Sequence, residues 1–183
     1  LMMAGIRDIA IITRSIDLDL YKNLLGDGSS FGISIAYLVQ DKANGIPEGY
    51  VLAKKFVGGR DIALILGDNI LIGQGLGKTL ETSTEQTGAR IFAFPVNNPQ
   101  DYGIVELKKN KILSIKEKPK KTKSNLAITG LYFFDKNVVN FSKKLKPSKR
   151  KELEIVDLLK KYLKIKKLKA EFMGRGSAWL DTG

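Results

Sequence analysis

The stretch Asp61–Gly73, which reads DIALILGDNILIG, decides the fold of this chain. It opens with five consecutive apolar residues, Ile62–Leu66, a run that is too short to cross a membrane and is typical of a central strand covered on both faces of a parallel sheet. Gly67–Asn69 follows directly and places a carboxylate and an amide at the carboxyl end of that strand, where open α/β sheets bind ligands. The same triplet is also common in plain turns, so its context has to decide between a site and a turn.

The segments on either side of this stretch predict alternating strands and helices. Strands at Asp8–Thr13 and Ser34–Val39 precede it, and helices at Tyr21–Leu25 and Pro47–Phe56 connect the three strands. This β-α-β-α-β order favours a Rossmann-like α/β fold with a doubly wound, mostly parallel sheet. Further strands are expected at Ala89–Val96, Gly103–Leu107, Ile112–Lys116, Leu126–Phe134 and Leu168–Met173, with helices at Lys136–Lys143 and Glu152–Leu163.

Composition limits the chemistry that the chain can perform. At 183 residues and 43% hydrophobic content, residues 1–183 are expected to form a single domain with a sizeable core. The sequence contains no cysteine and no histidine, which excludes disulfides, thiolate catalysis, imidazole bases and ordinary zinc sites. Catalysis therefore has to use carboxylates, lysine, arginine, backbone amides or an oxygen-ligated metal. No signal peptide or bilayer-length apolar run is present, so we expect a cytoplasmic protein without a membrane partner.

The net charge of +12 is concentrated in one part of the sequence. Between Lys108 and Lys169 there are 21 basic and 5 acidic residues, against 10 and 14 in the remainder. One interpretation is a basic module that binds nucleic acid. We favour a solvated lysine surface and expect no nucleic acid partner, because 20 of the 21 are lysine, interleaved stacking aromatics are lacking, and arginine is the usual reader of bases.

Seven spaced segments carry a family resemblance that extends over nearly the whole chain. They read LLGDGSSFGI, LILGDN, NNPQDYGIVEL, SIKEKPKKTKSN, ITGLYFFD, KPSKRKELEIVD and GRGSAWLDTG. In this order and at these intervals they resemble the glucose-1-phosphate thymidylyltransferases, a family of sugar nucleotidyltransferases. The resemblance implies the fold of the nucleotide-diphospho-sugar transferases, with dTTP and glucose 1-phosphate as the two substrates.

The reaction implied by the resemblance is an in-line attack of the sugar phosphate on the α-phosphorus of dTTP, which gives dTDP-glucose and pyrophosphate. This product feeds deoxysugar synthesis, such as that of dTDP-rhamnose, for cell-surface polysaccharides. Phosphoryl chemistry of this kind depends on positioning and cations rather than on a histidine base. By resemblance, Asp68 and Asp181 ligate the cofactor Mg²⁺, which usually takes one or two carboxylates, and Arg150 joins them as a catalytic residue.

The sugar-phosphate side of the site also carries over by resemblance, to Tyr102, Gly103, Glu117, Lys118, Tyr132 and Arg150. A glycine at 103 lets the backbone approach the sugar hydroxyls, and the planar fork of an arginine suits phosphate. Plainer interpretations remain: Glu117 and Lys118 as an exposed ion pair, and Tyr132 as a core residue.

The nucleotide side resembles the family less closely. Gln40 matches a glutamine that reads the thymine edge, Gly45 and Ile46 match the segment that packs on the base, and Asp68 is expected near the triphosphate. The family commonly has Leu-Ala-Gln-Ala where this chain has residues 46–49, Ile-Pro-Glu-Gly. The choice between dTTP and UTP therefore stays open, and a uridylyltransferase or another sugar-1-phosphate nucleotidyltransferase is the alternative.

The resemblance also implies that residues 1–183 are incomplete at both ends. Family members begin with a strand and a glycine-rich GGxGTRLxPxT loop that cradles the triphosphate, and neither matches the opening LMMAG. A C-terminal helical portion that helps family members to form tetramers is also expected beyond Gly183. We therefore expect the isolated 183-residue chain to lack activity and the parent protein to be a homo-oligomer.

Overall fold

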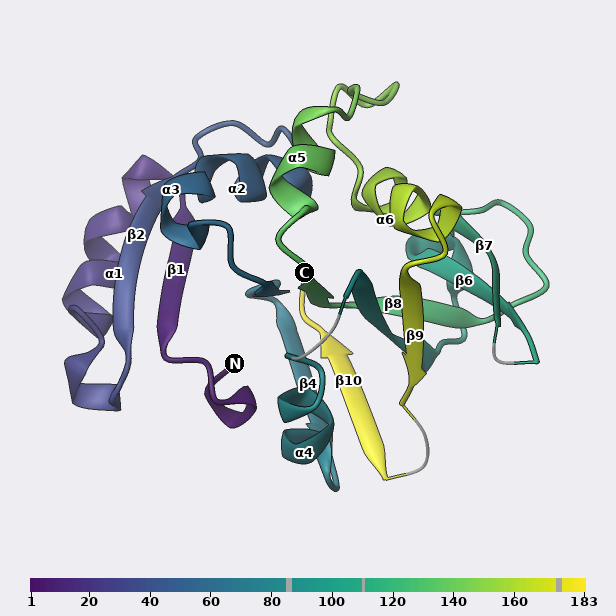
Figure 1. The fold of residues 1–183 in the computed structure, drawn as a ribbon, viewed down its shortest axis with the longest axis horizontal. Coiled ribbons are helices and arrows are strands. Elements are labelled where there is room, and N and C mark those ends of the chain that lie inside the picture. The colour runs from purple at the N-terminus through teal and green to yellow at the C-terminus, as the bar shows by residue number, and fades with distance from the viewer. Residues whose placement is uncertain (85–86, 110, 174–175) are drawn as a thin grey trace.

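The computed structural model describes residues 1–84, 87–109, 111–173 and 176–183 (Figure 1). Its strands are β1 (Asp8–Thr13), β2 (Ser34–Val39), β3 (Ile62–Ile65), β4 (Asn69–Gly73), β5 (Ala89–Pro95), β6 (Gly103–Lys108), β7 (Lys111–Glu117), β8 (Leu126–Phe134), β9 (Leu168–Phe172) and β10 (Ser177–Asp181). Its α-helices are α1 (Leu18–Leu25), α2 (Ile46–Leu52), α3 (Lys54–Val57), α4 (Leu76–Glu81), α5 (Val138–Lys143) and α6 (Ile155–Lys164). Short 3₁₀ turns lie at Met2–Ala4, Ser15–Asp17, Ser29–Phe31 and Pro99–Asp101.

The main sheet is built around β8. Its strand order is β7-β6-β8-β5-β9, and β3 also pairs with β8, along Leu131–Phe134. Every residue of β8 after Leu126 is buried, because the strand is apolar along its length and has partners on both edges. Successive side chains of a strand point to opposite faces, so β8 supplies Tyr132 and Phe134 to one core cluster and Leu131 and Phe133 to the other.

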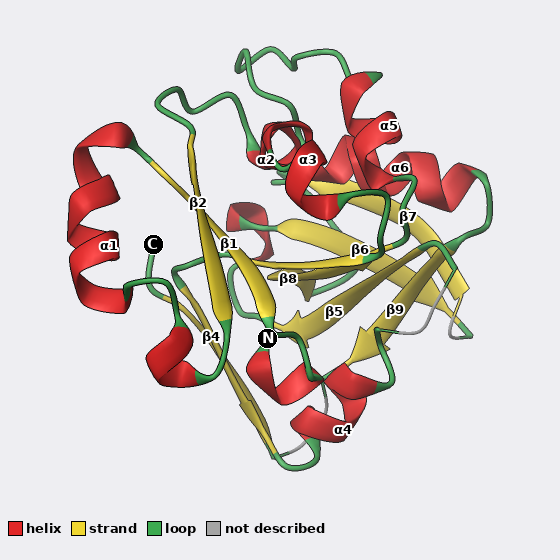
Figure 2. Ribbon diagram, turned by 60° about the vertical axis from the view of Figure 1, so that its left-hand side comes forward, coloured by secondary structure: helices red, strands yellow, loops and turns green. Residues whose placement is uncertain are grey.

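Helices cover both faces of this sheet, as Figure 2 shows. Helices α2, α3, α5 and α6 lie on one face, where Tyr50, Val138 and Leu158 pack against Tyr132 and its neighbours. The other face packs against α4 and the N-terminal turn, through Leu80 among others. Within the described residues, no helix is long and apolar enough to span a membrane.

The mixed α/β class predicted from the sequence is confirmed, while the pairing combines both strand directions. Strands β1 and β2 are parallel, as are β5 and β9. The other described pairs are antiparallel: β8 runs opposite to β3, β5 and β6, and the pairs β6–β7 and β4–β10 are antiparallel as well. The expected mostly parallel pairing therefore holds only at β1–β2 and β5–β9.

The prediction that Ile62–Leu66 forms the central strand was wrong. Strand β3 is only partly buried, and Ile65 is 37% exposed. The longer apolar run of β8 takes the central place, and β3 pairs along one edge of it. Among the described residues neither β1 nor β3 has a second strand partner.

A second two-stranded pair, formed by β4 and β10, was not anticipated. Asn69–Gly73 continues directly from the loop after β3, and this strand lies beside β10 (Figure 1). The two strands are antiparallel, and their register places Asp181 opposite Asn69. This register brings the GDN segment against the C-terminal part of the chain. It determines the geometry of the site described below.

Candidate functional site

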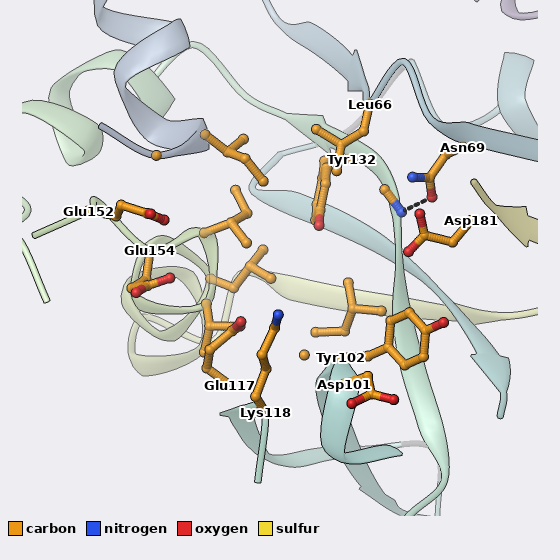
Figure 3. A pocket seen from close by; sticks show the side chains of 18 of the residues that line it. Leu66, Asn69, Asp101, Tyr102, Glu117, Lys118, Tyr132, Glu152, Glu154 and Asp181 are labelled. Atoms are coloured by element: carbon orange, nitrogen blue, oxygen red, sulfur yellow. Dashed lines mark hydrogen bonds between the residues drawn. The ribbon is translucent and has the colours of Figure 1, made fainter. Parts of the chain in front are cut away.

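A cavity of about 300 Å³ lies between the N-terminal end of α6, the β6–β7 hairpin and the β4–β10 pair (Figure 3). Of the site residues predicted from the sequence, those that line it are Gly45, Ile46, Tyr102, Gly103, Glu117, Lys118, Tyr132, Arg150 and Asp181. Figure 3 shows Asn69 and Asp181 together on one side, and Glu117 and Glu154 on the other, beside α6. Lys118 extends between these two groups toward Tyr132.

The carboxylates of Asp68 and Asp181 converge next to Gly183. A Cβ atom placed on Gly183 would lie 2.6 Å from Oδ2 of Asp68 and 3.6 Å from Oδ1 of Asp181, so both oxygens lie close to one point. Thr182 fastens the two segments, because its backbone N–H donates to the carbonyl of Asp68 at 2.9 Å. The two aspartates that the resemblance assigns to one cation, far apart along the chain, therefore lie close together in the fold.

These two carboxylates suit a hard divalent cation. Mg²⁺ is typically bound by one or two carboxylates and completes its shell with water and substrate phosphates. The described residues contain no cluster of three or more acidic, histidine or cysteine side chains that could enclose a metal on their own. Asp68 and Asp181 therefore fit a cation that takes two ligands from the protein and its remaining ligands from water and a bound substrate.

Glu117 and Lys118 lie at the end of β7, where the backbone holds them against Tyr102. The backbone of Lys118 has a positive φ of 38°, a conformation that residues other than glycine seldom adopt. Its N–H donates to the carbonyl of Tyr102 at 3.0 Å and stabilises this conformation. Burial, with a further contribution from Glu154, raises the pKa of Glu117 above its usual value. A carboxylate with this environment can accept a hydrogen bond from a sugar hydroxyl.

Arg150 is held at the cavity by Glu154. Nε and Nη2 of Arg150 donate to Oε1 and Oε2 of Glu154 at 3.1 and 2.7 Å, and Nη2 lies 3.5 Å from Oε1 of Glu117. The hydroxyl of Ser148 also donates to Glu154, at 2.7 Å. The hydrogen bond to Glu154 raises the pKa of Arg150, and the same bond lowers the pKa of Glu154. Nη1 of the guanidinium is not used in these contacts.

Tyr132 belongs both to the core and to the cavity wall. Its side chain is 4% exposed and stacks on Phe134, as the plainer interpretation of this residue expected. Burial raises the pKa of the Tyr132 hydroxyl well above its usual range, and the charges of Glu117 and Asp181 act in the same direction. Tyr132 therefore remains a neutral hydroxyl that can donate a hydrogen bond.

Gly103 lies where a side chain would crowd the wall of the cavity. A Cβ atom there would come within 3.2 Å of Val156 and 3.5 Å of Oε2 of Glu117. The ring of the preceding Tyr102 contacts Trp179 edge to face, at 5.2 Å between centroids. This part of the wall is therefore built from a glycine and two packed aromatic rings.

Gln40 is not among the residues that line the cavity. Its side-chain amide donates to Oε2 of Glu48 at 2.7 Å and approaches the carbonyl of Gly45 at 3.4 Å. Gly45 itself has a φ of 98°, and any Cβ there would collide with the backbone of Leu153. Gln40 thus contacts the loop that forms the cavity wall, and its assignment to the thymine edge stays a prediction.

Several residues of the site belong to the sequence segments quoted above, where no role was assigned to them individually. Glu154, Asn69, Gly130 and Trp179 line the cavity although they were not predicted as site residues. Asn69 and Trp179 belong to the quoted segments LILGDN and GRGSAWLDTG, so these segments contained the signal without showing the contacts. Glu154 is placed by the start of α6, which a sequence pattern locates only to within a few residues.

Comparison with known proteins gives relatives along the whole chain. A glucose-1-phosphate thymidylyltransferase of Neisseria meningitidis serogroup A is 50% identical over 185 residues, which cover 100% of this chain and 64% of that protein. A crystal structure from Bacillus anthracis, described as a glucose-1-phosphate thymidylyltransferase in complex with sucrose, is 39% identical and has a TM-score of 0.89. The match covers 99% of this chain and 73% of that one.

A more distant structure, a UDP-glucose pyrophosphorylase with UDP-glucose, is 22% identical with a TM-score of 0.81 over 99% of this chain and 77% of that one. At this identity it shares the fold alone. The chain spans 64% of the length of its Neisseria relative. The family model described as nucleotidyl transferase matches residues 1–183. Because that match extends over every residue of the sequence, the chain belongs to the nucleotidyl transferase family.

Proposed function

We propose that this chain supplies the sugar-phosphate pocket and the metal-binding carboxylates of a glucose-1-phosphate thymidylyltransferase. The observation that carries the proposal is a single cavity with Asp181 at one side and Lys118 and Arg150 among the residues that line it. Asp181 suits a cation bound to a triphosphate. Lys118 and Arg150, which lie among Glu117 and Glu154, suit the phosphate of a sugar phosphate. The names of the relatives support this choice of substrates.

In the proposed reaction, a phosphate oxygen of glucose 1-phosphate forms a bond to the α-phosphorus of dTTP. The bond between that phosphorus and the oxygen leading to the β-phosphate breaks, and pyrophosphate leaves with the electron pair. Asp68 and Asp181 would hold Mg²⁺, which supplies neutralisation of negative charge on the phosphates. No group has to remove a proton, which suits a chain without histidine.

The chain's own side chains bind and orient the sugar phosphate in this proposal. Lys118 and Arg150 hold the phosphate, so that its attacking oxygen faces the nucleotide. Glu117 accepts hydrogen bonds from sugar hydroxyls, and the neutral hydroxyl of Tyr132 donates one. Gly103 leaves room for the ring beside the backbone.

The alternative within the same class is a uridylyltransferase. The departure from the family at residues 46–49 lies at the base side of the cavity, where Gly45 and Ile46 form the wall. Affinities for dTDP-glucose and UDP-glucose, compared at equal salt, distinguish these two readings. A tetrameric parent protein is likewise part of the proposal and rests on the resemblance.

Binding is the appropriate test for the 183-residue chain. We propose that this chain binds its ligands without turning them over, because the family's triphosphate loop has no match in its sequence. Calorimetric titration with dTDP-glucose should show saturable binding. Because hydrogen bonds to charged groups contribute about 1.5–3 kcal/mol, Glu117→Gln or Lys118→Ala should weaken binding about tenfold or more.

Lys120 provides a matched control for the loss of a positive charge. It lies on the same loop as Lys118, is exposed, and does not line the cavity. Lys120→Ala should leave the affinity for dTDP-glucose within about twofold, since exposed charges contribute little. Absence of saturable binding at millimolar dTDP-glucose, or equal losses in Lys118→Ala and Lys120→Ala, would contradict the proposed site.

A further inference from the structure

We propose that Asn69 is a positioning residue that turns the carboxylate of Asp68 toward Asp181. This inference rests on the proposed metal-binding role of the two aspartates and adds a residue that acts through one of them. Asn69 is 8% exposed, at the start of β4, and its side chain connects β4, β8 and β10. It would touch neither the substrate nor the reacting atoms.

The orientation of the Asn69 amide follows from its hydrogen bonds. Its Oδ1 accepts from the backbone N–H of Gly130 at 2.8 Å, the bond drawn as a dashed line at Asn69 in Figure 3. The same oxygen accepts from the indole Nε1 of Trp179 at 2.6 Å. Both partners are N–H groups and can only donate, so they require the oxygen of the amide on their side. The NH₂ group must then point the other way, where it donates to Oδ1 of Asp68 at 2.7 Å.

This contact leaves the two oxygens of Asp68 with different roles. Oδ1 is occupied by Asn69, whereas Oδ2 is the atom that lies 2.6 Å from the position of a Cβ on Gly183, beside Asp181. A carboxylate without the amide would rotate about its χ2 torsion, which is broad for aspartate. The hydrogen bond from Asn69 therefore preorganises Oδ2 as the oxygen offered to a cation.

Gly130 provides the space in which the Asn69 amide lies. A Cβ on Gly130 would come within 2.6 Å of Cγ and Oδ1 of Asn69 and within 2.7 Å of its Nδ2. Position 130 lies in the central strand β8, where the register against β5 shifts between Ile91 and Ala93, and it has no positive φ. The glycine is needed here for close approach of the amide rather than for backbone freedom.

Paramagnetic NMR of the 183-residue chain tests the inference without any turnover. Mn²⁺ alone serves as the probe, because it broadens the amide signals of nearby residues even when it binds weakly. Titration should broaden the signals of Thr182 and Gly183 first, with a half-saturation concentration that rises strongly in Asp68→Asn. Loss of an outer partner of a metal ligand typically weakens binding 10–100-fold, and this is the expected effect of Asn69→Ala.

Two further variants keep the test informative if Asn69→Ala folds poorly. Trp179→Phe retains a ring but removes one of the two donors that fix the amide, and it should weaken Mn²⁺ binding about 3–10-fold, less than loss of the amide itself. Asn137→Ala is the matched control, because Asn137 donates to Asp135 at 3.1 Å and does not line the cavity. It should leave the Mn²⁺ affinity unchanged.

The outcomes separate this inference from the proposed function. If Asp68→Asn abolishes the broadening but folded Asn69→Ala and Trp179→Phe titrate like the parent chain, Asn69 has only a structural role and the inference is overturned. If Mn²⁺ does not broaden Thr182 and Gly183 in the parent chain, or does so equally in Asp68→Asn, the metal-binding role of Asp68 fails and the inference fails with it. If Asn69→Ala lowers the melting temperature but leaves the Mn²⁺ affinity unchanged, the positioning role of Asn69 is also contradicted.

Discussion

Arg150 and Glu154 form a two-point ion pair in the wall of the cavity, with Nε and Nη2 of the arginine each donating to one carboxylate oxygen. One edge of the planar guanidinium is therefore committed to the protein. Nη2 also lies 3.5 Å from Oε1 of Glu117, whereas the donors of Nη1 are not used in these contacts. A pair arranged in this way can present an arginine to a phosphate with little loss of side-chain freedom on binding.

We predict that Arg150→Lys weakens the binding of glucose 1-phosphate, although it keeps the positive charge. A lysine cannot contact Glu154 at two points and a phosphate at the same time, so the affinity should fall about 3–10-fold. Calorimetry measures this loss. Lys149→Ala, which removes an exposed neighbouring charge outside the cavity, should change the affinity by less than about twofold. Equal affinities of Arg150→Lys and the parent chain would show that only the charge matters.

Glu154 should make the stability of the chain sensitive to acid. Its hydrogen bond from Arg150 lowers the pKa of Glu154 below the ordinary value of 4.5. A lowered folded-state pKa means that the stabilisation is complete above pH 4.5 and is lost as the pH falls through the folded-state value. The melting temperature of Glu154→Gln should therefore approach that of the parent chain as the pH is lowered from about 6 to about 3. A constant difference across this range would contradict the assignment.

We predict that Glu48 helps to select the base. A carboxylate can only accept, so Gln40 must direct its NH₂ group to Glu48, which leaves its oxygen to accept from an imide N–H such as that of thymine or uracil. Glu48→Ala should lower the affinities for dTDP-glucose and UDP-glucose together, by about 3–10-fold, with little effect on ADP-glucose. Asn44→Ala removes the other amide held by Glu48 and is the control. Parallel losses for all three nucleotides would speak against base selection.

The paired aspartates should oppose stability in the absence of a cation. Asp68 and Asp181 direct oxygens of like charge toward one point, which costs free energy when nothing neutralises them. Asp181→Asn should therefore leave the melting temperature unchanged or raise it by up to about 2–4 °C in metal-free buffer. The stabilisation of the parent chain by millimolar Mg²⁺ should disappear in this variant. A variant that melts lower and still responds to Mg²⁺ would assign Asp181 a structural role.

The sequence was sufficient for the position of most strands and for the two-sided α/β arrangement, because apolar runs such as Leu126–Phe134 have a clear signal. It was not sufficient for their pairing. The run Ile62–Leu66 is apolar enough for a central strand. The longer apolar strand β8 takes the central position, however, and β3 pairs with part of it. Strand β4 was missed because Asn69–Gly73 reads as a turn followed by a short apolar stretch until β10 is present to pair with it.

The site was predictable where a residue contributes its own chemistry and less so where it supports another residue. Asp181, Lys118 and Arg150 could be assigned from motifs and line the cavity. The supporting contacts, from Glu154 to Arg150 and from Asn69 to Asp68, depend on distances that the spacing of residues in the sequence does not give. Supporting contacts of this kind form only when separate segments are folded together.

The pairing of β10 with β4 has a consequence for local unfolding at the C-terminal end of the chain. Two-stranded ribbons are only marginally stable by themselves, and among the described residues β10 pairs with β4 alone. Its amides should therefore exchange with solvent faster than those of β8, through local openings that also carry Asp181 away from Asp68. A cation held by both carboxylates would oppose these openings and slow amide exchange in β10. The rate of hydrogen exchange in β10 would therefore report on occupancy of the site.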